Sequence, residues 1–231
     1  MLKRIITSIF ALCVLIPVLF LSNTWVFPIA ISIVSVMCLF EMFRCMGHHK
    51  NFALTLPAYV IGAALPILQR VFENGTKIIA ISAVCAVAYL VYSFALVIWS
   101  HGKFTYADMA NSVLTSLYIV FALNMILYIR DFGNNGHILY LLIFIGAWIT
   151  DIFAYFTGVF FGKHKLIEDV SPKKTIEGSI GGTVFCALSF VVTGIIADLF
   201  FGCNANLIFL GFSGIFISFN NIYKQKNRKR K

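Results

Sequence analysis

Long apolar runs follow one another along almost the whole chain, and they restrict the fold more than any other feature of the sequence. A helix that spans a membrane needs about 20 mostly apolar residues, and 60% of the 231 residues are hydrophobic whereas only 12% are charged. The runs do not alternate between apolar and polar residues, which favours helices over the strands of a membrane barrel. We therefore predict an all-α, polytopic integral membrane helical bundle of about eight transmembrane helices. These lie at roughly 5–22, 25–43, 52–69, 78–99, 112–129, 137–160, 183–201 and 205–220.

The third run is the weakest of the eight. It contains Pro57 and Pro66, and proline removes a hydrogen bond from the interior of a helix. The pattern is therefore compatible either with a spanning helix or with a segment that re-enters the membrane.

Basic residues are distributed unevenly between the two sides of the predicted bundle. With eight spans, fifteen of the 18 lysines and arginines fall on the side that carries both termini, and Arg70, Lys77 and Arg130 fall on the other. Cytoplasmic segments of membrane proteins are enriched in Lys and Arg. Both termini are therefore predicted to lie in the cytoplasm. The protein itself is predicted to be a multi-pass protein of the inner (cytoplasmic) membrane of the cell. The net charge of +9 then reflects topology, and no nucleic-acid partner is expected.

The connections between the apolar runs are short, so we predict a single transmembrane domain over 1–220. Residues 161–182 form the longest polar connection and are predicted to be a cytoplasmic loop that binds substrate. The strongly basic residues 221–231 are predicted to be a cytoplasmic tail attracted to anionic membrane lipid.

Ionisable and small residues concentrate between Asp151 and Gly182. Asp151, Tyr155 and Gly158 follow one another at spacings of four and three, which places them on one helix face, and we expect this face to look into the bundle. An ionised carboxylate in hydrocarbon needs a cation, a basic side chain or water. Two interpretations stay open for Asp151, a ligand of Mg²⁺ or an ion pair with a nearby lysine. Tyr155 is either a packing aromatic or a substrate contact.

The predicted loop itself carries Lys163, Lys165 and the string SPKKTIEGSIGG from Ser171 to Gly182. Lysine ammonium groups neutralise phosphate charge, and glycines let backbone N–H groups approach phosphate oxygens. The alternative is a loop whose lysines only satisfy the positive-inside rule. The combination of turn formers, paired cations and glycines directly before an apolar run favours a phosphate-binding segment.

These residues resemble a known family. Asp151, Ala154, Tyr155, Gly158, Phe161, Gly162, Lys163, Lys165 and Leu166, followed by SPKKTIEGSIGG, are similar to the phosphatidate cytidylyltransferases, and the opening MLKRIITSI and the segment LFEMFR around Glu41 are similar to that family's amino-terminal half. The resemblance implies transfer of CMP from CTP to phosphatidic acid in the presence of Mg²⁺, giving CDP-diacylglycerol and pyrophosphate.

The resemblance also implies roles for individual residues. Lys173 and Lys174 would contact phosphate, and Asp151 would act with them as a catalytic residue. Asp151 and Glu177 would bind metal or orient the lysines. Substrate would be bound by a further group, namely Tyr155, Lys163, Lys165, Ser171, Thr175, Gly178, Gly181 and Gly182.

One part of the family pattern is absent. The family carries a second signature near its carboxyl end, of the form SxxKRxxxxKDxxxxxPGHGGxxDRxD, and after Gly214 this chain reads IFISFNNIYKQKNRKRK. Three explanations compete: truncation, loss of activity, and completion by another chain. The abrupt change favours truncation, and the sequence leaves open whether this chain is active by itself.

Other functional interpretations also stay open. The chain is alternatively a small-solute transporter, a non-catalytic membrane protein, or an enzyme that uses CTP on a different membrane substrate. The sequence leaves the choice between a monomer and a homo-oligomer open.

Overall fold

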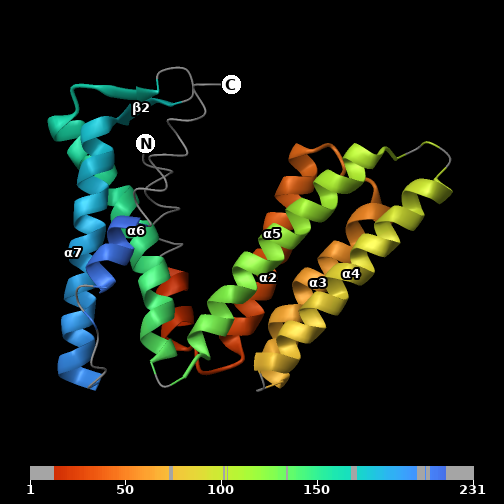
Figure 1. The fold of residues 1–231 in the computed structure, drawn as a ribbon, viewed down its shortest axis with the longest axis horizontal. Coiled ribbons are helices and arrows are strands. Elements are labelled where there is room, and N and C mark those ends of the chain that lie inside the picture. The colour runs from red at the N-terminus through yellow and green to blue at the C-terminus, as the bar shows by residue number, and fades with distance from the viewer. Residues whose placement is uncertain are drawn as a thin grey trace. The chain divides into compact units, whose positions relative to one another are not determined.

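The computed structural model describes residues 13–72, 75–100, 102, 104–133, 135–167, 171–201, 206 and 209–216. The described residues contain six helices that are long and apolar enough to cross a membrane. They are α2 (Val26–Cys45), α3 (Phe52–Val71), α4 (Gly75–Trp99), α5 (Tyr106–Arg130), α6 (Gly136–Phe161) and α7 (Ile176–Phe201), as Figure 1 shows. The chain is thus an all-α, polytopic, multi-pass membrane protein, as predicted.

The remaining predicted spans fall largely outside this description. Residues 13–20 and 209–216 are helical and belong to the predicted spans 5–22 and 205–220. The rest of those two spans, and the predicted basic tail 221–231, lie outside the described residues.

By their internal contacts the residues group into two compact units, Met1–Tyr128 and Ile129–Lys231. The sequence pattern, which predicts one domain, gives no sign of this division. Hydropathy shows that a helix enters the membrane, and it does not show which neighbouring helix the residues pack against.

The first unit is built around contacts among α2, α3, α4 and α5. Its core includes Leu39 and Phe43 of α2, Leu65 of α3, Tyr89 of α4 and Val113 of α5. On one side of this unit, Nε2 of His48 lies 3.4 Å from Oδ1 of Asp108. This contact joins the connection after α2 to the first turn of α5.

Helix α3 is continuous through both of its prolines, which favours a spanning helix over a re-entrant segment. Pro57 has no N–H to give the carbonyl of Ala53, four residues earlier. The hydroxyl of Tyr92 on α4 donates to that carbonyl oxygen at 2.8 Å, and Tyr89 donates to the carbonyl of Leu54 at 3.2 Å. Neighbouring side chains that satisfy freed backbone groups are what allows proline inside a membrane helix.

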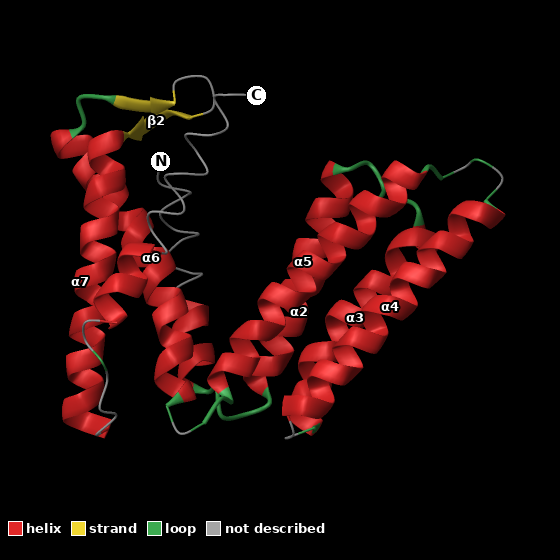
Figure 2. Ribbon diagram, viewed as in Figure 1, coloured by secondary structure: helices red, strands yellow, loops and turns green. Residues whose placement is uncertain are grey.

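The second unit contains α6 and α7, which pack closely, the strands β1 (Lys165–Ile167) and β2 (Ser171–Thr175) between them in sequence, and the helical residues 209–216. Figure 2 shows this hairpin at the end of the helix pair. The predicted loop 161–182 therefore contains regular secondary structure. It comprises the end of α6, an antiparallel hairpin and the first two turns of α7, which begins at Ile176 rather than near residue 183. Glycine-rich sequence such as GSIGG has low helix propensity, which is why the sequence pattern favours a loop there.

Candidate functional site

The segment with the predicted chemistry is held in place by the way the hairpin joins α6 to α7. Helix α6 ends at Phe161, and the N–H of Gly162 donates to the carbonyl of Gly158 at 3.1 Å. In the hairpin, Lys165 lies opposite Thr175 and Ile167 opposite Ser171. The N–H of Ile176 then donates to the carbonyl of His164 at 2.9 Å. The base of the hairpin is therefore fixed to both helix ends.

The first turn of α7 is capped by residues of the same segment. Thr175 occupies the cap position, and its Oγ1 accepts the N–H of Gly178 at 3.1 Å, as cap threonines do. The carboxylate of Glu177 accepts the N–H of His164 at 3.2 Å and lies 2.7 Å from its Nδ1. An acid in the first turn also neutralises the positive end of the helix dipole. These contacts give Thr175 and Glu177 structural roles beside their predicted roles at substrate and metal.

The glycines of the motif pack α7 against α6. A Cβ on Gly178 would lie 2.5 Å from the carbonyl oxygen of Ala154, and one on Gly182 would lie 2.8 Å from that of Thr150. A Cβ on Gly181 would overlap the side chain of Thr157. Such close approach is possible only for small residues, and small residues four apart are a common contact motif of membrane helices.

Sequence reasoning assigned these glycines to substrate and missed their packing role. Small residues recur at a spacing of four on both helices, at Gly178 and Gly182 on α7 and at Thr150, Ala154 and Gly158 on α6. This spacing could have revealed the contact. In the helix interior, the N–H groups of Gly181 and Gly182 serve the helix itself. Their assignment to substrate stays a prediction.

Lysines are gathered at the hairpin. The side chains of Lys163, Lys165 and Lys174 are all exposed, and Lys163 and Lys165 flank His164, whose ring contacts Glu177. The backbone of Lys173 and Ser171 lies in β2, and their side chains lie outside the description. The structure therefore brings the backbone of all four predicted lysines to one end of the α6–α7 pair, and the three side chains that it describes are exposed there.

Asp151 and Tyr155 lie elsewhere on α6. Asp151 is ten residues before the end of α6 at Phe161, about 15 Å along the helix axis, so the structure does not bring it to the hairpin lysines. Both side chains are exposed, Tyr155 at 68%. Within the second unit, Gly158 packs against α7 and Asp151 and Tyr155 do not, because the surface of α6 that meets α7 is centred on Thr150, Ala154 and Thr157. The inward orientation of Asp151 and Tyr155 stays a prediction.

The described residues do not form a set of magnesium ligands. The carboxylate of Glu177 is bound to His164, and Gly182, five residues further along α7, packs at the level of Thr150 next to Asp151. Glu177 and Asp151 are thus separated by about 6 Å along the helix axes. Among the described residues, no group of three His, Cys, Asp or Glu side chains is arranged to hold a metal ion. The Mg²⁺ expected from the resemblance stays a prediction.

Comparison with known proteins adds an independent observation. Residues 2–221 match the cytidylyltransferase family, which is nearly the whole chain. The protein belongs to the cytidylyltransferase family. This family member is 31% identical over 185 residues to the phosphatidate cytidylyltransferase of Staphylococcus aureus (strain COL), covering 80% of this chain and 68% of that protein.

Two further relatives carry the same name. The Staphylococcus epidermidis phosphatidate cytidylyltransferase is 28% identical over 198 residues, which cover 85% of the present family member and 73% of the relative. The Aquifex aeolicus phosphatidate cytidylyltransferase is 56% identical over a shorter stretch of 55 residues, 23% of this chain and 21% of that protein. The family resemblance expected from the motif is confirmed.

Proposed function

We propose that this protein transfers CMP from CTP to phosphatidic acid, producing CDP-diacylglycerol and pyrophosphate. The observation that carries the proposal is a lysine-rich pair of strands at the end of a membrane helix pair, in a chain that belongs to the cytidylyltransferase family. A soluble nucleotide and a lipid headgroup can meet only at the surface of a membrane, and the end of the helix pair provides such a place.

The reaction requires control of negative charge. A phosphate oxygen of phosphatidic acid forms a bond to the α-phosphorus of CTP, and the bond from that phosphorus to the pyrophosphate oxygen breaks. Catalysis of phosphoryl transfer rests mainly on positioning and on cations that neutralise the charge of the phosphoryl oxygens. The side chains of Lys163, Lys165 and Lys174 are exposed at the hairpin, and we assign this role to them together with Lys173.

The connection from β2 to α7 supports the assignment of Lys174 to a phosphate contact. Thr175 joins the end of β2 to the first turn of α7 through the N–H of Gly178, so the adjacent Lys174 is next to a hydrogen-bonded part of the backbone. Preorganised cations stabilise a transition state without a reorganisation cost. Asp151, deeper along α6, is proposed to act on the lipid side of the reacting pair, and Tyr155, one turn later, to contact the same substrate.

The topology proposed for this function has eight spans in the inner membrane, with both termini in the cytoplasm. Positive charge supports it: Arg44, Lys50 and Lys103 fall at the same alternate helix ends as the hairpin lysines. Those ends would be cytoplasmic by the positive-inside rule, and CTP would reach the hairpin from there.

The direct test is incorporation of labelled cytidine from CTP into lipid by the purified protein in phosphatidic acid micelles. Lys165→Ala and Lys174→Ala should each lower turnover at least tenfold, about 1.4 kcal/mol of transition-state stabilisation, without loss of membrane insertion. Lys77→Ala, on the side predicted to be opposite, is the matched control and should retain activity. Equal activity in all three variants would remove the hairpin from the reaction.

A further inference from the structure

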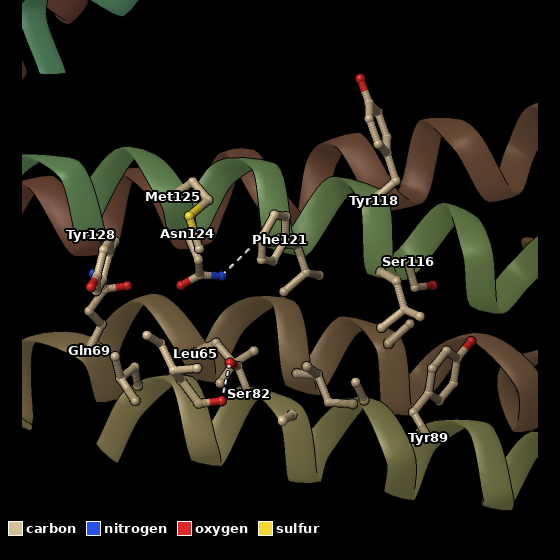
Figure 3. Close-up of a pocket in the computed structure, with 18 of the residues that line it drawn as sticks. Leu65, Gln69, Ser82, Tyr89, Ser116, Tyr118, Phe121, Asn124, Met125 and Tyr128 are labelled. Carbon is tan, nitrogen blue, oxygen red and sulfur yellow. Dashed lines mark hydrogen bonds between the residues drawn. The ribbon is translucent and has the colours of Figure 1, made fainter. Parts of the chain in front are cut away.

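A cavity of about 590 Å³ lies among α3, α4 and α5 of the first unit (Figure 3). The hairpin belongs to the second unit. Its volume is in the range of small-molecule binding sites, about 300–1,000 Å³. The walls are mostly aliphatic, with Leu65 from α3, Ala86 from α4 and Val120 from α5 among the lining residues, and none of the lining residues is charged.

One end of the cavity is polar. Figure 3 shows Gln69, Asn124 and Tyr128 grouped there, and Gln69 is only 7% exposed. The Nδ2 of Asn124 donates to the carbonyl of Val120 at 2.8 Å, which fixes the orientation of the carboxamide. Its Oδ1 is buried and accepts no hydrogen bond from any residue that the structure describes. A buried acceptor without a donor is costly, so a ligand that brings a donor to this position would be stabilised.

The cavity also has an apolar rim. Leu114, Tyr118 and Phe121 of α5 line it and are 67%, 75% and 63% exposed. Exposed side chains of this kind on a membrane helix suit contact with hydrocarbon. A hydrocarbon chain could therefore enter from the side without crossing a polar barrier.

We propose that this cavity binds the hydrocarbon chain of an uncharged, hydroxyl-bearing lipid, whose hydroxyl donates a hydrogen bond to Oδ1 of Asn124. The aliphatic walls match the chain, and the unpaired acceptor matches the hydroxyl. A phosphorylated headgroup does not fit, because burying its charge among uncharged residues would be strongly unfavourable. This binding site is separate from the proposed transfer reaction and does not depend on it.

The proposal can be tested with two probes on the purified full chain in detergent. The first is a monoacylglycerol with a photoactivatable diazirine in its acyl chain, and the second is the same molecule with both hydroxyls methylated. Mass spectrometry of the labelled peptides should place the first probe on α3, α4 and α5. The loss of one hydrogen bond should make the methylated probe bind about three- to tenfold more weakly.

Variants on one helix separate the cavity from general lipid contact. Ala86 lines the cavity, and Ala86→Trp should lower labelling at least tenfold. Its neighbour Val87, 63% exposed, gives the matched control Val87→Trp, which should label like the wild type. Equal labelling in the two variants would overturn the proposal.

A second variant tests the hydrogen bond without filling the cavity. Asn124→Leu replaces the carboxamide with an apolar side chain of similar size. Both probes should therefore still enter the cavity and label α3, α4 and α5. The preference for the hydroxyl over the methylated probe should disappear. A preference that persists would overturn the role of Asn124. Stronger competition by phosphatidic acid than by unlabelled monoacylglycerol, or crosslinks to a second copy of the chain instead of to the probe, would overturn the uncharged lipid as the occupant.

Discussion

Replacement of Gly178 by alanine should weaken the α6–α7 pair, because a single methyl group has no room at this contact. The new Cβ would lie 2.5 Å from the carbonyl oxygen of Ala154, 2.9 Å from Oγ1 of Thr175 and 3.1 Å from the Cα of Gly158. Two of these three atoms belong to the backbone, so relief requires movement of a helix rather than rotation of a side chain.

The size of the effect follows from two opposing contributions. Overpacking of a well-packed contact costs about 1–3 kcal/mol. Alanine in place of glycine in a helix returns about 0.5–1 kcal/mol. The expected net loss in the free energy of unfolding is therefore roughly 1–2 kcal/mol, which for a chain of this length corresponds to a fall in Tm of about 2–8 °C.

Thermal unfolding of the purified protein in detergent, followed by circular dichroism, measures this change. Gly211→Ala is the matched control, because a Cβ there would meet only Cγ2 of Val191, at 3.4 Å, an ordinary contact. Its Tm should be unchanged or slightly raised. Gly178→Ala should also lower CTP-dependent turnover, because displacement of the helices displaces the hairpin. A Gly178→Ala protein as stable as the Gly211→Ala protein would refute the close helix contact.

Two further changes test the polar contacts that the structure assigns to helix ends and prolines. Tyr92→Phe should lower the free energy of unfolding by about 1 kcal/mol, because the carbonyl of Ala53 loses its donor. Adding Pro57→Ala should restore most of the lost free energy of unfolding, because alanine at this position has an N–H for the carbonyl of Ala53. If denaturant titrations of the two single variants and the double variant gave additive effects, the hydrogen bond of Tyr92 would not compensate for Pro57. Thr175→Val should cost about 1 kcal/mol and speed hydrogen exchange at the N–H of Gly178, whereas Thr175→Ser should behave like the wild type; unchanged exchange in the valine variant would count against the cap.

Most of the helical fold could be predicted from the sequence. The predicted runs 25–43, 52–69 and 137–160 correspond closely to α2, α3 and α6, because the need to bury backbone hydrogen bonds in hydrocarbon makes an apolar run of this length a helix wherever it packs. The start of α7 was misplaced by seven residues, since the glycines that lower its helix propensity are stabilised by a neighbour that the local pattern does not show.

The candidate site was predictable in composition and only partly in geometry. The motif identified the family, which the comparisons confirm, and it identified the lysines that the structure places on the hairpin. The expected convergence of Asp151 with these lysines is not present in the described geometry, because ten helical residues separate Asp151 from the end of α6. The rise of a helix sets the distance between residues on it, about 15 Å for ten residues. The prediction from the sequence did not take this distance into account.

Composition and run length by themselves determined that this protein is a multi-pass helical membrane protein, since hydrophobicity and backbone satisfaction act locally along the chain. The motif likewise determined the family. Only the tertiary structure decided why the glycines are needed, which tyrosine satisfies the carbonyl freed by Pro57, and where an uncharged cavity lies beside Asn124. Each of these depends on partners tens of residues away in the chain, and packing of one helix against another is what brings such partners together.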